Sequence, residues 1–204
     1  ASAAVLFSEH SELSQVTLHA KAVGDLLVNK LDNGLIEMDF PNRSPEIVKN
    51  WPEQLIKGLS IQPSQCLKNA QAYFAIYDNA EDVINVQQNT DLIKQLAPLD
   101  VVVTAAVEEN QTLDKTTLTD LQQYDFVSRY FWPANGGDED PVTGSIHTGL
   151  APYWASILNK NALTAYQASK RGGILNCRVT EDRVFISGKA QHYMSGTINI
   201  DLEK

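Results

Sequence analysis

The sequence contains little cysteine, little positive charge and no long hydrophobic run. Its 204 residues include two cysteines, Cys66 and Cys177, which form no C-x-x-C pair, so neither a disulfide framework nor a zinc ribbon is expected. They are typical of free thiols that pack as small hydrophobic side chains in a reducing cytoplasm, the predicted location. No apolar stretch reaches the roughly 20 residues that cross a bilayer, so no membrane partner is expected.

Positive charge is scarce, because 16 Lys and Arg residues stand against 25 Asp and Glu residues, a formal net charge of −9. Clustered cations that neutralise phosphates are therefore lacking, and nucleic acid is excluded as a partner. The glycine-rich nucleotide patterns G-x-G-x-x-G and G-x-x-x-x-G-K-[ST] are absent. The four histidines show no metal-ligand spacing, and residues 138–140 do not match a calcium loop because Pro141 follows them. No metal or cofactor is expected.

The first 50 residues show strand patterns after an apolar start. Residues 1–7 are typical of the end of a buried helix. Apolar and polar side chains alternate over residues 16–19 and 36–40, which predicts two half-buried strands with a tight turn at Asn33-Gly34. Several prolines then interrupt the pattern, so a domain boundary is predicted between Pro41 and Pro52.

The remaining chain predicts an α+β fold with strands around one buried helix. The helix over residues 144–158 is apolar nearly all round, which suits enclosure by a sheet, and Pro152 should bend it. Another helix is predicted over residues 91–96, with Thr90 as its N-cap. Further helices are predicted at 52–59 and 79–86, and strands at 72–77, 99–107, 125–132, 162–168, 173–179, 183–187, 190–194 and 197–202.

The segment that points to chemistry is Glu-Asp-Pro-Val-Thr-Gly-Ser at residues 139–145, just ahead of the buried helix. The first amides of that helix, at Gly144 and Ser145, have no intrahelical acceptor and lie at the positive end of the helix dipole. They favour an anion such as a substrate carboxylate. Asp140 would lie within reach, so one group holds the substrate and another exchanges a proton with it.

Structural roles for the same residues remain open. Asp140 or Thr143 would then cap the helix, and Gly144 would permit close packing. His147 is open to two interpretations as well, because a lone histidine on an apolar helix either contacts substrate or forms a hydrogen bond within the core.

A longer block around this segment carries a resemblance. Residues 124–154 read YDFVSRYFWPANGGDEDPVTGSIHTGLAPYW and resemble the signature of the PhzF-like (phenazine biosynthesis-like) family, which shares the diaminopimelate epimerase fold. The resemblance continues through QASKRGG at residues 167–173 and RVFISGKA at residues 183–190. It extends back through MDFP at residues 38–41 to ASAAVLF at residues 1–7, and so covers essentially the whole chain.

The resemblance implies two pseudo-symmetric halves, each a curved sheet around a central helix, with the active site where the two helix N-termini face each other. Residues 1–45 would form a partial first half, and residues 46–204 the second half, with central helix 144–158 and a last strand that returns to the first half. The family is similar to isomerases and epimerases that work by acid–base chemistry without metal or cofactor. A small carboxylic acid as substrate and a homodimer are implied.

Site residues carry over onto matching positions of this sequence. The resemblance makes Asp140 the catalytic or proton-relaying acid, and Gly144 and Ser145 the substrate-carboxylate site. Thr143 and His147 are predicted to complete the substrate-binding set.

One departure from the family pattern matters for activity. The family's principal proton-transfer residue is a glutamate in an E-x-N-x-S-E-T segment, and its Gly-His pair precedes the first central helix. Neither occurs in these 204 residues, so an N-terminally truncated polypeptide with impaired isomerase activity is expected. The alternative is a non-catalytic remnant that binds a ligand or a partner.

Overall fold

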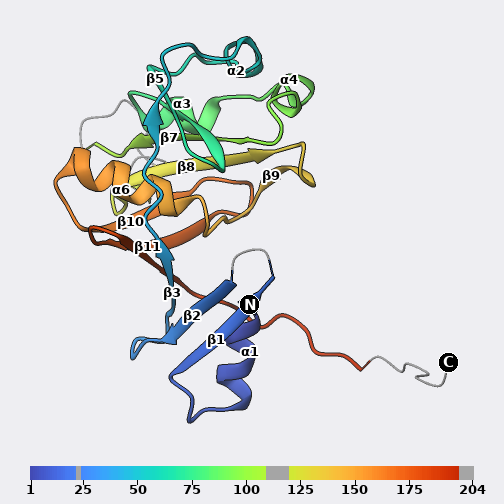
Figure 1. Ribbon diagram of the computed structural model, residues 1–204, viewed down its shortest axis with the longest axis vertical. Helices are drawn as coiled ribbons and strands as arrows, with labels where there is room; N and C mark the ends of the chain where they lie inside the picture. The colour runs from blue at the N-terminus through green and yellow to red at the C-terminus, as the bar shows by residue number, and fades with distance from the viewer. Residues whose placement is uncertain (22–23, 109–119, 198–204) are drawn as a thin grey trace. The chain divides into compact units, whose positions relative to one another are not determined.

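The computed structural model describes residues 1–21, 24–108 and 120–197, and these form two compact units (Figure 1). The smaller unit holds Ala1–Met38 and the described residues from Gly188 onward, and the larger unit is Asp39–Ser187. Each unit combines helix and strand, so the mixed α+β class predicted from the sequence is confirmed.

The smaller unit packs one helix against an antiparallel meander. Helix α1 (Ser2–Glu9) precedes strands β1 (Gln15–Ala20), β2 (Gly24–Lys30) and β3 (Ile36–Pro41), the last of which leads into the larger unit. Ala3, Phe7 and Val28 form its buried centre. The predicted turn at Asn33-Gly34 is confirmed, because Gly34 has φ +80°, a conformation that glycine adopts at little cost.

The larger unit is built on one mixed sheet. Its strand order is β12-β11-β10-β8-β7-β6-β5-β4, with β9 paired to β8. The strands are β4 (Glu46–Ile47), β5 (Gln65–Lys68), β6 (Ala72–Ile76), β7 (Asp100–Ala106), β8 (Phe126–Trp132), β9 (Gly137–Asp140), β10 (Ala162–Gln167), β11 (Gly173–Val179) and β12 (Arg183–Gly188).

Strand β8 has two partners along one edge. Strand β10 runs parallel to it and pairs Gln167 with Ser128, and β9 runs antiparallel and pairs Asp140 with Tyr130. Because β9 and β10 run in opposite directions along the same edge, their C-terminal ends meet head on. Asp140 and Gln167 are thereby brought together although they are 27 positions apart.

Helices cover both faces of this sheet. Helix α6 (His147–Leu158) lies on one face and packs Leu150 and Trp154 against Phe126 of β8. Helices α2 (Glu53–Gly58), α3 (Ala80–Asn85) and α4 (Thr90–Lys94) lie on the other face, over the side chains of Val127 and Phe131. The strand predicted at residues 125–132 is thus confirmed, and its side chains alternate between one core on each side of the sheet.

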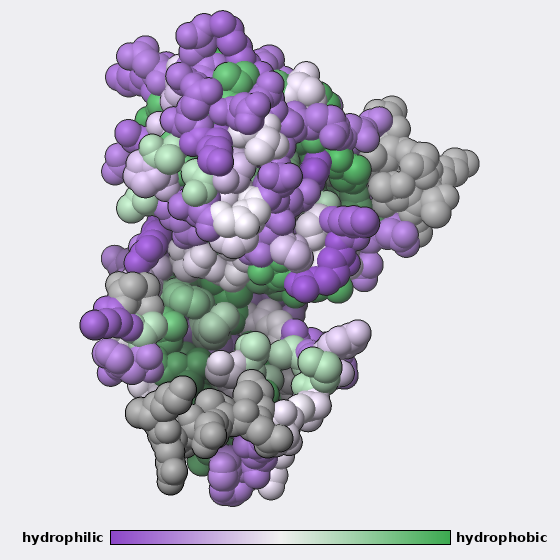
Figure 2. Space-filling view, turned by 90° about the vertical axis from the view of Figure 1, so that its right-hand side faces the viewer, coloured by the Kyte–Doolittle hydropathy of each residue, from purple (hydrophilic) through white to green (hydrophobic). Residues whose placement is uncertain are grey.

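The outer helices show polar side chains to the solvent. In Figure 2 hydrophilic (purple) side chains dominate the upper part of the molecule, where Figure 1 places α2 and α4. Their apolar side chains, Leu55 of α2 and Ile93 of α4, are buried against the sheet. These are short amphipathic helices that depend on the sheet for burial.

The structure corrects some predicted elements. Asn89 rather than Thr90 caps α4, because the Asn89 side chain accepts a hydrogen bond from the Leu92 amide. Residues 190–194 form no strand and are exposed. The predicted strand at 197–202 lies outside the described residues except for its first position. Strands β2, β5 and β9 were not predicted.

The cysteine prediction is confirmed, since Cys66 and Cys177 are both free and buried in the core. Burial raises the pKa of each thiol to about 12, so both stay protonated near neutral pH. Within the described ranges, no helix is both long and apolar enough to span a membrane.

Thr104 lies at a buried junction of helix and sheet, and replacing it by valine should destabilise the larger unit. Its hydroxyl donates to the Val127 carbonyl oxygen at 2.7 Å and accepts from Trp154 Nε1 at 3.0 Å. Thr104→Val keeps the shape but leaves the Trp154 N–H without an acceptor, at a cost of about 1–3 kcal/mol in the free energy of unfolding. Urea titration measures this. Thr164 is half-buried, and Thr164→Val is the control, which should lower the free energy of unfolding by less than about 0.5 kcal/mol. Equal losses of stability in the two variants would contradict the role given to the Thr104 hydroxyl.

Candidate active site at the start of helix α6

Asp140 is the last residue of β9 and faces the side of the sheet that α6 covers. Its register partner Tyr130 lies on the same face as Ser128 and Phe126. The negative charge of Asp140 contributes to the raised pKa of Tyr130, after burial and the hydrogen bond from Tyr130 to Asp100. Asp140 therefore lies beside the buried face of β8, at the point where the chain leaves the sheet toward α6.

Within the described residues, the Asp140 carboxylate has one hydrogen-bonding partner. The Thr143 hydroxyl donates a short hydrogen bond to Oδ2 of Asp140. The carboxylate is only half-buried, and no Lys, Arg or His side chain among the described residues pairs with it. It is thus held in place on one side and left available to a ligand on the other.

A turn joins this segment to α6. The amides of His147 and Thr148 donate to the carbonyl oxygens of Gly144 and Ser145, at 3.1 and 3.2 Å, as in a 3₁₀ turn. The predicted helix start at residue 144 is therefore corrected to His147. In the described chain the amides of Gly144, Ser145 and Ile146 have no acceptor. Three unsatisfied N–H groups at a helix start form a ready anion site.

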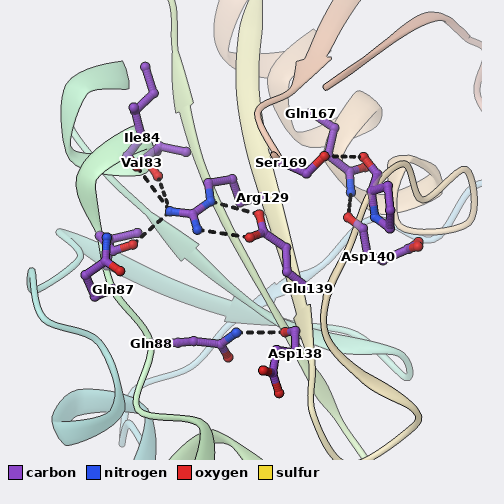
Figure 3. A network of polar contacts seen from close by, with 12 residues as sticks. Val83, Ile84, Gln87, Gln88, Arg129, Asp138, Glu139, Asp140, Gln167 and Ser169 are labelled. Carbon is purple, nitrogen blue, oxygen red and sulfur yellow. Dashed lines mark hydrogen bonds and ion pairs between the residues drawn. The ribbon is translucent and has the colours of Figure 1, made fainter. Parts of the chain in front are cut away.

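Gln167 fixes the backbone between Asp140 and this turn. Its Oε1 accepts from the Thr143 amide at 2.8 Å, and its Nε2 donates to the Asp140 carbonyl oxygen at 2.7 Å and to Thr143 Oγ1 at 3.2 Å. Gln167 is 0% exposed. In Figure 3 it lies directly over Asp140, next to Ser169, whose hydroxyl donates to the Pro141 carbonyl oxygen at 2.7 Å.

His147 is buried beneath the turn and touches no open space. It is 0% exposed, and its Nδ1 bonds the Thr143 carbonyl oxygen at 2.8 Å. A carbonyl only accepts, so the proton is on Nδ1. Burial lowers the pKa of His147 from 6.5 to about 4, so the ring is neutral at pH 7. Direct contact between His147 and a substrate does not fit this position, whereas the hydrogen-bonded core residue does.

A polar network borders the turn on its other side. Gln71 Nε2 donates to Ser145 Oγ at 2.9 Å and to the Tyr130 hydroxyl at 3.1 Å. The Tyr130 hydroxyl in turn donates to Asp100 Oδ2 at 2.5 Å, and Asn135 Nδ2 donates to Asp100 Oδ1 at 2.7 Å. The exposed Ser145 hydroxyl is therefore linked to strands β7 and β8, to the β5–β6 connection and to the loop before β9.

Glu139 points to the opposite face and has a structural partner. Arg129 donates from Nε and Nη2 to both carboxylate oxygens, at 2.9 and 3.1 Å, and from Nη1 to carbonyl oxygens at the end of α3 (Figure 3). The two side chains are 14% and 22% exposed. Adjacent carboxylates thus have separate roles, because Glu139 anchors β9 to α3 and only Asp140 faces the turn.

The structure gathers the residues singled out by sequence into one continuous segment, in which Ser145 is exposed, Asp140 and Gly144 are half-buried, and Thr143 and His147 are buried. Sequence reasoning missed the polar side chains that come from elsewhere in the chain, namely Gln71, Asp100, Tyr130, Asn135, Gln167 and Ser169. The sequence could have indicated Gln167 and Ser169, because both lie within residues 167–173 (QASKRGG), which resemble the family.

Metal ligands are not gathered anywhere in the parts of the chain that are described. Across residues 1–21, 24–108 and 120–197, no group of three or more His, Cys, Asp or Glu side chains is close enough to hold an ion.

Comparison with known proteins gives a consistent result. The family model described as phenazine biosynthesis-like protein matches residues 1–196. An uncharacterized isomerase of Halalkalibacterium halodurans is 40% identical over 93% of this chain and 67% of its own length. An uncharacterized isomerase of Pseudomonas aeruginosa is 38% identical over 98% of this chain and 71% of its own length.

Solved structures agree with this result. A phenazine biosynthesis PhzC/PhzF protein from Clostridium difficile superposes with a TM-score of 0.80 at 32% identity, over 97% of this chain and 70% of that one. A PhzF-family protein from Enterococcus faecalis gives a TM-score of 0.77 at 30% identity, over 93% and 67%.

The neutral buried state of His147 makes stability depend on pH. Its folded pKa of about 4 lies below its unfolded value of 6.5, so the unfolded state binds the proton first as pH falls. The stabilisation is present above pH 6.5 and is lost between pH 6.5 and 4, about 3 kcal/mol in all. His147→Gln keeps a donor for the Thr143 carbonyl but does not titrate. Urea titrations at pH 7 and pH 4.5 measure how much the free energy of unfolding falls between the two pH values. This fall should be smaller for His147→Gln than for the unaltered chain, and an identical fall in both would contradict the prediction.

Proposed function

Since this chain belongs to the phenazine biosynthesis-like (PhzC-PhzF) protein family, we propose that it is an isomerase or epimerase that moves a proton on a small carboxylic acid without a cofactor. Three relatives, one from Halalkalibacterium halodurans and two from Pseudomonas aeruginosa, are named uncharacterized isomerases, which supports this reaction class. The observation that carries the proposal is the position of Asp140, a half-buried carboxylate that pairs with no cation among the described residues and is hydrogen-bonded to Thr143, directly before the amides of residues 144–146, which have no acceptor there.

The amides would hold the substrate carboxylate. Gly144, Ser145 and Ile146 present N–H groups at the positive end of α6, and a helix start of this kind stabilises negative charge. A carboxylate there replaces water on groups that no protein acceptor satisfies. In a protein with a formal net charge of −9, backbone dipoles supply the attraction without a Lys or Arg side chain.

Proton transfer follows from the same geometry. Removing a proton from the carbon next to the carboxylate sends a second negative charge onto the carboxylate oxygens. The amides stabilise that charge more strongly than the ground state, which lowers the barrier. Asp140 takes up or returns the proton, and the Thr143 hydroxyl orients its carboxylate.

A second proton-transfer group completes an isomerisation, because the proton leaves one position and returns to another. The resemblance assigns that role to a glutamate in an E-x-N-x-S-E-T segment, which these 204 residues do not contain. We therefore expect lower turnover from the 204 residues alone than from a polypeptide that carries the segment. A homodimer stays a prediction.

Asp140→Asn should remove proton transfer. The assay incubates the protein, with and without an upstream glutamate segment, with a panel of small carboxylic acids in D₂O and follows deuterium incorporation by NMR. Loss of the acid–base carboxylate should reduce the rate by at least about 100-fold. Asp138→Asn, an exposed carboxylate on the same strand, is the matched control and should exchange as the unaltered chain does. Deuterium incorporation that survives Asp140→Asn would refute the assignment.

Two substitutions of Ser145 test whether its backbone N–H binds the substrate, and they separate the effect of the N–H from that of the side-chain hydroxyl. Ser145→Pro removes one free N–H at a position where proline costs no protein hydrogen bond, and Ser145→Ala removes only the hydroxyl. The proline variant should lower the exchange rate by about 10²- to 10³-fold, as for loss of one oxyanion donor. The alanine variant should lose less than about tenfold. Equal rates for the two variants would show that the Ser145 amide does not bind the substrate.

A further inference from the structure

We infer that Gln167, assisted by Ser169 and His147, is a positioning residue that holds the backbone of residues 140–144 so that Asp140 and the free amides face one ligand. The inference rests on the proposed function and adds residues to its site. Each peptide unit between Asp140 and Gly144 is bound by one of these three side chains, and none of the three belongs to the segment itself.

Gln167 holds the segment at both ends. The Asp140–Pro141 peptide has no N–H because its nitrogen belongs to proline. The Asp140 carbonyl oxygen is therefore the only hydrogen-bonding group of this peptide, and Gln167 Nε2 donates to that oxygen. Gln167 Oε1 accepts from the Thr143 amide. The side-chain amide has one workable orientation, because exchanging its O and N atoms would set donor against donor at Thr143 and acceptor against acceptor at Asp140.

The same amide sets the direction of the bond to the Asp140 carboxylate. Gln167 Nε2 also donates to Thr143 Oγ1 at 3.2 Å. The hydroxyl oxygen therefore accepts from Gln167, and its own hydrogen is directed to the Asp140 carboxylate. Gln167 acts on Asp140 through Thr143 and does not touch the reacting atoms, which makes it a positioning residue and not a catalytic one.

Ser169 and His147 hold the two remaining peptides. The Ser169 hydroxyl donates to the Pro141 carbonyl oxygen, and His147 Nδ1 donates to the Thr143 carbonyl oxygen. The Thr143 carbonyl and the Gly144 N–H belong to one planar peptide, so fixing the carbonyl oxygen also fixes the direction of the N–H. His147 thereby orients the first amide of the anion site.

Packing secures Val142, an apolar side chain of the segment. A Cβ atom built on Gly173 would lie 2.1 Å from Val142 Cγ2, so only glycine lets the β10–β11 connection approach this closely. Gln167 is the last residue of β10, and Ser169 lies in that connection. The hydrogen bonds of Gln167 and Ser169 and the close packing of Gly173 therefore come from the same short stretch, residues 167–173.

The test compares Gln167→Met with a matched control. Methionine is neutral and similar in length, so it removes all three hydrogen bonds without adding charge. Gln62→Met is the control, because Gln62 Nε2 also donates to two carbonyl oxygens, those of Ile56 at 2.7 Å and Leu59 at 3.4 Å, far from Asp140 in the chain. Ser169→Ala removes only the contact with Pro141 and serves if Gln167→Met does not fold.

The measurement is a titration with sodium acetate, followed by the backbone ¹H–¹⁵N signals of Gly144, Ser145 and Ile146. The unaltered chain should show saturable shifts of these signals, and Gln167→Met should bind acetate about tenfold more weakly. Ser169→Ala should weaken binding by a smaller factor, and Gln62→Met should not change it.

The outcomes separate the two ideas. If the unaltered chain shows no acetate-dependent shifts at these amides, the carboxylate site of the proposed function fails, and the inference fails with it. If the unaltered chain binds acetate, and Gln167→Met and Ser169→Ala bind it with the same affinity, the inference alone is refuted. This holds even if the variants have lower thermal stability, because a purely structural role lowers stability without changing the affinity of the folded protein for acetate.

Discussion

The arrangement of the site depends on one constraint, the head-on meeting of β9 and β10 along the same edge of β8. One strand runs parallel to β8 and the other antiparallel, so their C-terminal ends converge where Ser128 and Tyr130 lie. The chain leaves the sheet at Asp140 with its next backbone groups beside Gln167. A shift of one residue in either register would turn Asp140 or Gln167 to the opposite face, and the contacts would be lost.

The two faces of the sheet separate Glu139, which has a structural partner, from Asp140, the carboxylate for which proton transfer is proposed. Glu139 forms an ion pair with Arg129, and Arg129 also donates to carbonyl oxygens at the end of α3. Strand β9 is therefore fixed to α3. Asp140 points the other way, where the Thr143 hydroxyl is the one partner of its carboxylate in the part of the chain that the structure describes. A neutral donor holds a carboxylate without neutralising it, which suits a group that exchanges protons.

The anion site proposed at the start of α6 would rely on backbone N–H groups. Among the described residues the amides of residues 144–146 have no acceptor, and His147 below stays neutral because burial lowers its pKa to about 4. The ring therefore adds no charge and contributes through its Nδ1 hydrogen bond. In the proposed site the electrostatic attraction to the anion would come from backbone dipoles, whose direction depends on the rigidity of the preceding segment.

The sequence alone determined the mixed fold, the strand at residues 125–132, the family, and the segment that contains Asp140, because strand patterns, apolar runs and an ordered motif are local properties of the chain. It placed the start of the helix three residues early, because capping and 3₁₀ turns depend on hydrogen bonds that a pattern of side chains does not specify. Only the tertiary structure decided that His147 is buried, that Glu139 and Asp140 part to opposite faces, and that Gln167, Ser169 and Gln71 reach the turn. These depend on strand register between distant segments, and register is decided by the packing of the whole sheet.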